Sequence, residues 1–330
     1  MKNPNQDTSR LSRRLIAYLR NRLRNADITY DVPPTPMLGG YATSIYRFAL
    51  SGIEGALGKP LVLRLYPQSR GADAVAWEST VQNALAGEGL AVARVHLVCA
   101  DLSVLGGAFF IMEHLPGRQL ISAPTRVLHE ILGKTHAELH RRDPGTLIKK
   151  LNENGIDRYR YTLTEQFDRL VDHAAEFPWI REAVDWLIDN RPPEPERLSI
   201  CHRDFHALNI LFAGGKVTGI LDWPDLLITD PVFDVANTLV LLTIPGKHFA
   251  SDFVKLGMDN ASDLDAEALA ALYLAAYRTH RPLDMTNLDY YRVARCVKFL
   301  FTGLYQRRPI IEDFLTYIEK VSGVRVLMPA

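Results

Sequence analysis

A short polar segment between two apolar runs is the feature that most restricts how this chain can fold. In ICHRDFHALNILF, residues 200–212, apolar ends typical of buried strands enclose His202, Asp204, His206 and Asn209. A chain that buries both ends must give these polar groups partners or a ligand. The segment is therefore either an ordinary loop between strands or a catalytic loop.

A second carboxylate follows this segment at a short distance. Gly214 and Gly215 predict the tight turn of a hairpin, and GKVTGILDW places Asp222 at the end of the returning strand. Such a hairpin brings Asn209 and Asp222 to the same end. Two oxygen ligands from neighbouring strands suit Mg²⁺, which keeps substrate phosphates as further ligands. With Asp204 one loop away and able to accept a hydroxyl proton, the set predicts phosphoryl transfer.

The patterns of the chain predict a strand-rich part, residues 1–115, and a larger helical part, residues 116–330. In the first part TSIYRFAL, PLVLRLY, ARVHLVC and GAFFIMEH predict strands, and residues 71–89 predict a helix. The second part is interrupted by short strands between residues 199 and 222. Its expected helices are 125–141, 163–176, 180–189, 265–278 and 288–306. A small strand-rich part followed by a helical part is an α+β arrangement.

An arginine-rich amphipathic helix is predicted at the N-terminus. Leu11, Leu15, Leu19 and Leu23 recur four residues apart in SRLSRRLIAYLRNRLRN, so one face is apolar and the other basic. We expect the apolar face to dock on the protein. A mitochondrial transit peptide and a helix on a membrane surface are the weaker alternatives.

The composition limits the partners and the compartment. Lys+Arg and Asp+Glu both number 38, so the charge balance gives no support for a nucleic-acid partner. No apolar run approaches the length of a membrane span, so we expect no membrane partner. Cys99, Cys201 and Cys296 are far apart, odd in number and without metal-type spacing. A reduced, cytoplasmic location is the simplest interpretation.

The combined pattern HRDFHALNILF, GKVTGILDW and DPVFD resembles the aminoglycoside phosphotransferase family, which is related to choline kinases and more distantly to protein kinases. The family pattern is H-x-D-x-x-x-x-N, then an apolar residue with D-W, then D-P-x-x-D. The resemblance covers about residues 36–307. It implies a two-lobed protein-kinase-like fold, ATP and Mg²⁺ as cofactors, and a small hydroxylated molecule as acceptor. It also implies Asp204 as the catalytic residue and Asn209 and Asp222 as the metal ligands.

An arginine interrupts one of the apolar strand patterns. In PLVLRLY, Arg64 needs a partner if it is buried, and Glu78 on the following helix is the obvious one. The resemblance implies that this pair steadies the ATP phosphates, as the strand cation and helix carboxylate of kinase-type sites do. Many relatives have Lys at this place. Arg is not an equivalent replacement, because its planar fork can bind Glu78 and phosphate together.

Two backbone segments complete the nucleotide site that the resemblance implies. Gly39 and Gly40, in MLGGYATSIYRF, match the family's glycine-containing loop and would let backbone approach the ATP phosphates. A plain hairpin turn is the alternative interpretation. FFIMEHLPG resembles the segment that joins the two lobes, where backbone from Glu113 to Leu115 would contact adenine.

A pair of histidines has the spacing of metal ligands. HAELH places His136 and His140 on one face of a predicted helix, as zinc ligands often are. The Glu that follows the first His in zinc peptidases is absent, however. The family carries a similar leucine-histidine ending on this helix with a packing role. We therefore expect packing rather than metal binding.

The other polar residues near Asp204 leave alternatives open. His202 is expected to brace the loop through a backbone hydrogen bond. His206 would either touch the transferring phosphate or cap the loop. Asp234, in DPVFD, would either cap the helix that it opens or, as the resemblance implies, anchor the catalytic loop from behind. The role of Asp230 stays open.

Three functional classes compete. A small-molecule kinase that transfers the γ-phosphoryl group of ATP to a hydroxyl fits best. A protein kinase fits less well, because Trp223 replaces the Phe-Gly expected after Asp222 and the segment before Asp230 is too short for an activation loop. A nucleotide-binding protein without catalysis is the third class, and the intact Asp204, Asn209 and Asp222 count against it.

The charge of the last hundred residues bears on the acceptor. Residues 231–330 carry eleven Asp+Glu and eleven Lys+Arg, so they lack the acidic excess that a polycationic aminoglycoside needs. The same stretch is rich in aromatic residues, most of which suit a packed core. We therefore expect an acceptor that is neutral or singly charged and has an apolar portion.

Overall fold

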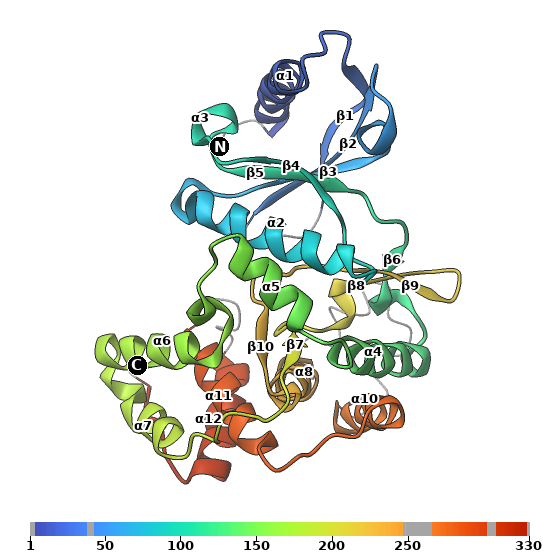
Figure 1. Cartoon of the computed structure of the whole chain (residues 1–330). Coiled ribbons are helices and arrows are strands. Elements are labelled where there is room, and N and C mark those ends of the chain that lie inside the picture. The colour runs from blue at the N-terminus through green and yellow to red at the C-terminus, as the bar shows by residue number, and fades with distance from the viewer. Residues whose placement is uncertain (1–3, 38–42, 247, 249–265, 302–307, 329–330) are drawn as a thin grey trace. The chain divides into compact units, whose positions relative to one another are not determined.

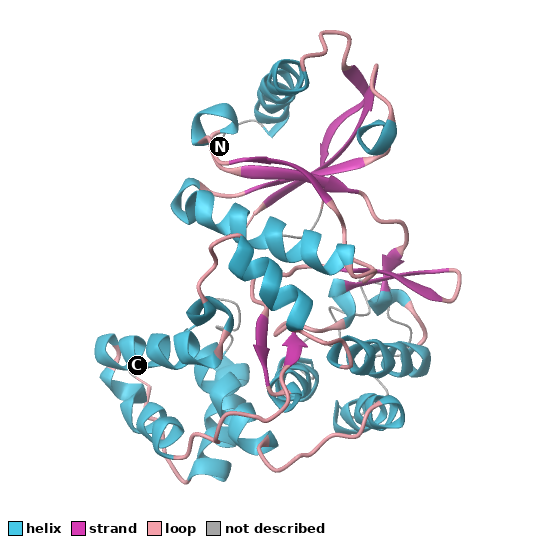
Figure 2. Ribbon diagram, in the orientation of Figure 1, coloured by secondary structure: helices cyan, strands magenta, loops and turns pink. Residues whose placement is uncertain are grey.

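The computed structural model describes residues 4–37, 43–246, 248, 266–301 and 308–328, which form two compact units (Figures 1 and 2). Unit 1 comprises Met1–Pro116 together with Thr218–Pro224, and unit 2 comprises Gly117–Val217 together with Asp225–Ala330. Residues 218–224 thus belong with the strand-rich part, although they follow the candidate catalytic loop in the sequence.

Unit 1 is built on a five-stranded antiparallel sheet with the strand order β1-β2-β3-β5-β4. The strands are β1 (Thr29–Pro36), β2 (Ser44–Ser51), β3 (Leu61–Leu65), β4 (Val95–Cys99) and β5 (Phe109–Glu113). The helices are α1 (Pro4–Leu23), α2 (Gly71–Gly87) and the short α3 (Leu102–Leu105). The strands predicted from the sequence are therefore present, and so is the helix predicted over residues 71–89.

The two faces of this sheet are covered by different helices (Figure 1). Leu61 and Leu63 of β3 pack in a core with Leu15 and Leu19 of α1, all four fully buried. On the opposite face, Phe110 packs with residues of α2. A strand that is covered on both faces reads as a nearly continuous apolar run. This explains why PLVLRLY lacks clean alternation, and the docking predicted for the N-terminal helix is confirmed.

Strand β1 was not expected from the sequence, because Pro33, Pro34 and Pro36 lie within it. It forms the edge of the sheet. At an edge the missing N–H group of a proline can face solvent, so no carbonyl of a neighbouring strand loses a hydrogen bond. Its pairing with β2 shifts register twice, between Tyr30 and Val32 and between Val32 and Thr35. The edge position thus explains a strand whose composition argues against one.

Several hydrogen bonds hold residues 218–224 in unit 1. Thr218 Oγ1 donates to the Pro116 carbonyl at 2.5 Å, and the Ile220 N–H donates to the Ala91 carbonyl at 2.6 Å. Trp77 Nε1 on α2 donates to the Pro224 carbonyl at 2.8 Å. Asp222 therefore lies in a segment that is fixed against α2 and the strands of unit 1.

Unit 2 is mainly helical and contains two small sets of strands. Its helices are α4 (Thr125–His140), α5 (Gly145–Glu153), α6 (Leu163–Glu176), α7 (Arg181–Asp189), α8 (Pro231–Thr243), α10 (Ala266–His280), α11 (Leu288–Phe301) and α12 (Arg308–Ser322). Strands β6 (Arg118–Gln119), β8 (Ile210–Ala213) and β9 (Lys216–Ile220) form one sheet, and from Thr218 onward β9 belongs to unit 1. Strand β7 (Ser199–Cys201) pairs with β10 (Leu227–Thr229). No helix in the described ranges is long and apolar enough to cross a membrane.

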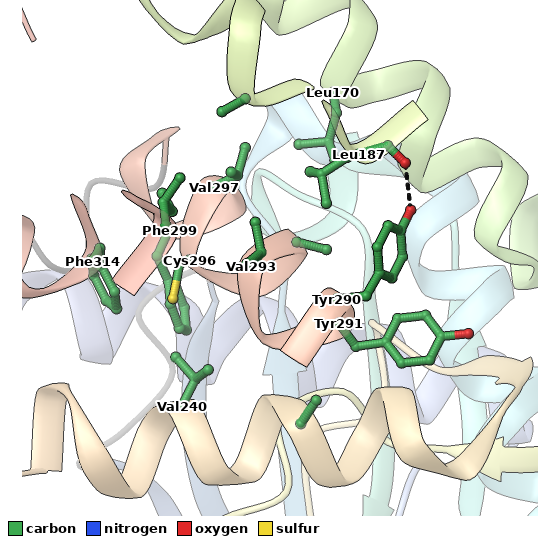
Figure 3. Close-up of a cluster of buried hydrophobic side chains, with 14 of the residues drawn as sticks. Leu170, Leu187, Val240, Tyr290, Tyr291, Val293, Cys296, Val297, Phe299 and Phe314 are labelled. Carbon is green, nitrogen blue, oxygen red and sulfur yellow. Dashed lines mark hydrogen bonds between the residues drawn. The ribbon is translucent and has the colours of Figure 1, made fainter. Parts of the chain in front are cut away.

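The core of unit 2 is organised around α11 (Figure 3). Val293, Cys296 and Val297 are fully buried between α8, α7 and α12, and Tyr290 donates a hydrogen bond to the Leu187 carbonyl at 2.7 Å. Most of the described aromatic residues between 231 and 330 are core residues, as expected. Three further aromatic residues between 231 and 330, namely Phe249, Phe253 and Tyr305, lie outside the described residues.

Most helices of unit 2 were predicted from their apolar periodicity. Helices α4, α6, α7, α10 and α11 confirm the five expected ones to within a few residues, and residues 302–306 of the last lie outside the described range. Helices α5 and α12 were not expected.

Candidate functional site

The candidate catalytic loop, residues 202–209, connects two strands of unit 2. Strand β7 before the loop is fully buried and pairs with β10, where Ile200 faces Ile228. Strand β8 after it pairs with β6 and leads into the turn at Gly214 and Gly215, both with positive φ. This is the hairpin turn that the sequence predicts, and the buried strands fix both ends of the polar segment.

Asp204 is the partly open carboxylate of the loop, with its side chain 34% exposed. Asn209 Nδ2 donates to the Asp204 carbonyl at 2.9 Å and approaches Oδ2 at 3.3 Å. His206 Nε2 lies 3.2 Å from Oδ2, and Arg295 Nη2 lies 3.4 Å from Oδ1. Burial opposes ionisation of Asp204, but His206 and Arg295 outweigh it and hold the pKa below its usual range.

The two histidines of the loop both hold its backbone. His206 Nδ1 accepts the Leu208 N–H at 3.3 Å and caps the short helical turn Ala207–Asn209. Because Nδ1 is the acceptor, Nε2 carries the proton and donates to Asp204. His202 Nδ1 accepts the Asp204 N–H at 3.3 Å. His202 is thus the brace that the sequence predicts, and of the two alternatives for His206 the structure contains the cap.

Asp234 anchors the loop from behind and is fully buried in the first turn of α8. It accepts the backbone N–H groups of His202 at 2.5 Å and of Arg203 at 2.7 Å. The cap of α8 is Asp230, which accepts the Val232 N–H at 2.9 Å. Both open questions about this segment are thereby answered, since capping and anchoring fall to different carboxylates.

Two imidazoles complete the shell of Asp234. Nε2 of His136 lies 3.0 Å and Nε2 of His140 lies 3.2 Å from Asp234 Oδ2. The Nδ1 atoms face the hydroxyl groups of Tyr273 and Tyr277 at 2.7 and 2.8 Å. Burial opposes ionisation of Asp234, but the histidines outweigh it and lower its pKa well below the usual range. A carboxylate that stays ionised only accepts, so Nε2 of each ring donates to Asp234. In His140, whose pKa is lowered by burial, Nδ1 accepts from the Tyr277 hydroxyl.

The same three side chains are close enough together to hold a metal ion. Every ring nitrogen of His136 and His140 is already used in a hydrogen bond, however. His136 also stacks on Phe205 of the loop, with ring centroids 4.0 Å apart. We interpret the cluster as a packed support for the loop, and the expectation that it binds no metal stays a prediction.

Unit 1 contains a second polar cluster around Arg64. Its Nη1 lies 2.9 Å from Glu78 Oε1, and its Nη2 lies 2.7 Å from Asp222 Oδ1. The ion pair between Arg64 and Glu78 that the sequence predicts is thus present. Burial alone would lower the pKa of Arg64, but the carboxylates of Glu78 and Asp222 outweigh it and raise the pKa. Arg64 remains charged.

Glu78 is fully buried, whereas the Asp222 side chain is 41% exposed. Burial raises the pKa of Glu78, and the hydrogen bonds from Tyr66 and Gln82 act against this rise together with Arg64. The exposed partner of the arginine is therefore Asp222, which the sequence predicts as a metal ligand.

Two backbone positions with positive φ lie within these clusters. Arg203 has φ +70° and Asp222 has φ +68°; among the described residues that are not glycine, only Arg24 shares such a value. Residues other than glycine adopt this region at a cost and often do so at functional sites. The observation singles out the positions next to Asp204 and at the predicted metal ligand.

The other predicted site residues are the nucleotide-binding backbone segments and the pair of metal ligands. Gly39 and Gly40 lie outside the described residues. The Glu113 N–H donates to the Arg94 carbonyl and the His114 N–H donates to the Pro60 carbonyl, both within unit 1. Leu115 follows β5 without regular structure. Asn209 belongs to unit 2 and Asp222 to unit 1, so the metal site that they would share stays a prediction.

Sequence reasoning missed the cations around Asp204. Arg295 on α11 is buried, and Lys298 follows one turn later. Arg203 Nη2 donates to Gln166 at 2.7 Å, and its Nη1 lies 3.7 Å from Asp225 Oδ1. The available signal was the i, i+3 spacing of Arg295 and Lys298 on a helix whose other residues are mostly apolar.

Several curated proteins are similar to this chain over part of their length. Acyl-CoA dehydrogenase family member 11 of Gallus gallus is 30% identical over 196 residues, which cover 54% of this chain and 25% of that protein. The probable acyl-CoA dehydrogenase IBR3 of Arabidopsis thaliana is 27% identical over 304 residues, 81% of this chain and 36% of that protein. The chain thus spans about a quarter to a third of these relatives.

Solved structures with the same fold are aminoglycoside and macrolide phosphotransferases. A protein from Ralstonia eutropha, provisionally described as an aminoglycoside phosphotransferase, has a TM-score of 0.62 at 20% identity, covering 92% of this chain and 98% of its own. Aminoglycoside phosphotransferase APH(4)-Ia has a TM-score of 0.60 at 15% identity, with coverages of 94% and 98%. The macrolide 2′-phosphotransferase MphH of Brachybacterium faecium has 0.54 at 17%, with coverages of 92% and 97%.

These similarities confirm the α+β fold of protein-kinase-like type that the sequence predicts. The family comparison covers most of the chain, because the profile of the phosphotransferase enzyme family matches residues 35–284. The chain therefore belongs to the phosphotransferase enzyme family.

Proposed function

We propose that the protein transfers the γ-phosphoryl group of ATP to a hydroxyl of a small molecule. The observation that carries the proposal is the placement of Asp204. Its carboxylate is partly exposed, while the backbone on its N-terminal side is held by Asp234. A carboxylate that is fixed in this way can orient an acceptor hydroxyl, and phosphoryl transfer depends mainly on such positioning.

The chemistry of Asp204 follows from its surroundings. Its lowered pKa makes it a weak base, so we assign it mainly the orientation of the acceptor hydroxyl and acceptance of the proton late in the transfer. His206 and Asn209 keep the carboxylate in place through the contacts at Oδ2. A carboxylate with several fixed neighbours loses little entropy when the hydroxyl arrives.

The proposed cofactor is a magnesium–nucleotide complex. The Asn209 side chain uses its nitrogen on the Asp204 carbonyl, which leaves Oδ1 as the natural cation ligand, and the exposed Asp222 carboxylate would be the second. Bound Mg²⁺ would neutralise charge that develops on the phosphates. Arg64, held by Glu78, would bind the α- and β-phosphates. Adenine would contact the Glu113 carbonyl and the Leu115 N–H, since the N–H groups of Glu113 and His114 are used internally.

The charge of residues 231–330 and the names of the curated relatives support a proposal for the acceptor. The even charge of residues 231–330 supports a neutral or singly charged acceptor with an apolar portion rather than a polycation. Relatives over most of this chain carry the name of acyl-CoA dehydrogenases. We therefore place hydroxylated acyl compounds first among the acceptors. A cytoplasmic location fits such a metabolic role.

The experiment is a screen of hydroxylated metabolites and antibiotics for ADP release, followed by substitution of Asp204. We expect Asp204→Asn to lower turnover by roughly 10²-fold or more with ATP affinity nearly unchanged, as for the loss of a residue acting on the proton. Asp168→Asn is the matched control, because this exposed carboxylate of unit 2 contacts Tyr159 at the surface. Turnover of Asp204→Asn within a few-fold of the control would remove Asp204 from its role.

A further inference from the structure

Helix α11 places a buried arginine beside the carboxylate that would orient the acceptor. Arg295 Nη2 lies 3.4 Å from Asp204 Oδ1, and the arginine side chain is only 6% exposed. Lys298 lies one helical turn further along and is partly exposed. Neither cation has a part in the catalytic scheme above, although both are near its central residue.

Part of the hydrogen-bonding capacity of Arg295 has no partner in the described part of the chain. Nε of Arg295 is buried and has no hydrogen-bond partner among the described residues. The contact with Asp204 is also long, since charge-assisted hydrogen bonds of this kind are usually about 2.7–2.9 Å. The guanidinium lies over the Phe299 ring, with its central carbon 4.1 Å from the centroid. A buried arginine held on an apolar ring with unused donors is prepared for a further acceptor of hydrogen bonds.

The charges around Asp204 point in the same direction. Arg203 has Gln166 and both the carboxylate and the carbonyl of Asp225 as partners, although its buried Nε also lacks a hydrogen bond in the described part of the chain. The carboxylates near Arg295 and Lys298 are Asp204 and Asp225, and Asp225 is also a partner of Arg203. Three cations, Arg203, Arg295 and Lys298, thus lie near two carboxylates, Asp204 and Asp225. Burial, followed by the neighbouring Arg203, lowers the pKa of Lys298 to about 7. An added anion would relieve this excess.

We propose that the acceptor carries an anionic group close to its hydroxyl and that Arg295, supported by Lys298, binds this group. The inference rests on the proposed function and specifies its substrate class. A hydroxyl that is hydrogen-bonded to Asp204 brings its nearest substituents within reach of Arg295, because the two side chains are in contact. The anion is a carboxylate, as in a hydroxy acid, or a phosphate ester on a small polyol.

Two other roles of Arg295 predict different kinetics. An arginine that only positions Asp204 would affect turnover of every acceptor equally. An arginine that binds the γ-phosphate would affect the KM of ATP with every acceptor. An arginine that binds an acceptor anion affects kcat/KM only for acceptors that carry the anion.

The test therefore combines a change in the protein with a change in the acceptor. Hydroxy acids are compared with their amides, and glycerol phosphate is compared with glycerol to test for a phosphate ester. We expect the wild-type protein to favour one anionic set over its neutral partners by roughly tenfold to a hundredfold in kcat/KM, the range of a charge-assisted hydrogen bond. Arg295→Met should lose this preference, and Arg295→Lys should keep part of it.

Arg292→Met is the matched control on the same helix. Arg292 lies over the Tyr317 ring at 4.4 Å and contacts Thr243, so its removal deletes a cation one turn away from Arg295. This variant should retain the preference for the anionic acceptor. An equal loss of turnover with acids and amides in Arg295→Met, or a rise only in the KM of ATP, would overturn the proposal. So would a wild-type protein that does not discriminate between the anionic and neutral partners.

A binding measurement without nucleotide separates this inference from the proposed activity. Butyrate is compared with butyramide, and glycerol phosphate with glycerol, at equal ionic strength. One of the two anions should raise the thermal unfolding midpoint of the wild-type protein and of Arg292→Met but not of Arg295→Met. The absence of a shift in the wild-type protein would contradict the anion site. A shift without phosphorylation of any hydroxyl compound would leave the anion site intact and refute the phosphotransferase activity.

Discussion

Two fully buried carboxylates, Glu78 in unit 1 and Asp234 in unit 2, are stabilised by different means. Glu78 pairs with the guanidinium of Arg64 and accepts hydrogen bonds from Tyr66 and Gln82. Asp234 accepts two backbone N–H groups and two imidazole N–H groups, none of which needs a formal charge. One carboxylate thus fixes a cation, and the other fixes a segment of backbone.

This difference indicates what each cluster can do. Arg64 has an exposed second partner, Asp222, so its position allows a phosphate group to become a further partner. The donors around Asp234 all point inward to a residue without exposure. They have no free side toward a ligand, and a change among them alters the backbone next to Asp204. The first cluster is suited to binding and the second to support.

Substitution of Asp234 is expected to have the largest effect. Asp234→Asn replaces an acceptor by a group with an N–H₂, which would face buried N–H donors. Each buried donor that loses its partner costs about 1–3 kcal/mol, so we expect a loss of at least about 3 kcal/mol in the free energy of unfolding. Chemical denaturation measures this value, and turnover should fall in parallel because the loop loses its anchor.

Asp230→Asn provides the control for this prediction. It lies four residues away on the same segment and caps α8, and Asn is about as good a cap as Asp. We expect a change of about 1 kcal/mol or less. Equal losses in the two variants would mean that Asp234 supports α8 rather than the loop, and the proposed contrast with Glu78 would fail.

The Arg64 cluster should respond with smaller changes in stability and larger changes in nucleotide binding. Arg64→Ala should weaken ATP binding by roughly tenfold or more, since a charge-assisted contact is worth about 1.5–3 kcal/mol. Arg64→Lys should retain part of the affinity, because it keeps the charge but loses the planar fork. Titration calorimetry with ATP and Mg²⁺ measures both. Equal affinities in all three proteins would show that Arg64 is only the partner of Glu78.

The sequence predicted the parts of the site that depend on local order along the chain. Asp204, Asn209 and Asp222 are recognisable because their spacing is fixed by one loop and one hairpin. Arg64 and Glu78 could be paired because a buried cation requires a partner and one helix offered it. The fold class followed from the same pattern together with the division into strand-rich and helical parts.

The contacts that join distant segments could not be predicted. Tyr273 and Tyr277 meet the histidine pair from a helix more than a hundred residues away, and Arg295 reaches Asp204 across 91 residues. The local pattern of α10 does not distinguish its tyrosines from ordinary core residues, and the i, i+3 spacing of Arg295 and Lys298 on α11 does not show which carboxylate they meet. Strand β1 was missed for another reason, since its prolines are tolerated only because it lies at the edge of the sheet.

We expect the pH dependence of stability to show the smallest of these effects. It tests whether Asp234 has uncharged partners where Glu78 has a charged one. Burial lowers the pKa of His140 to about 3, and His136 adds to this shift. In the unfolded chain a histidine titrates near its ordinary value of about 6.5. Between these values the unfolded state binds one proton more than the folded state. The free energy of unfolding therefore falls as the pH falls, by about 1.4 kcal/mol per pH unit from this group.

His140→Gln tests this assignment, because glutamine keeps a neutral donor but does not titrate. We expect a lower stability at pH 8 than in the wild-type protein, and a shallower slope between about pH 6 and pH 4 in denaturant titrations. Tyr277→Phe removes the hydroxyl that faces His140 Nδ1 and leaves the imidazole, so its slope should stay that of the wild-type protein. An unchanged slope in His140→Gln would mean that His140 is protonated in the folded protein. Asp234 would then be paired with a charge, as Glu78 is, and the distinction between the two buried carboxylates would disappear.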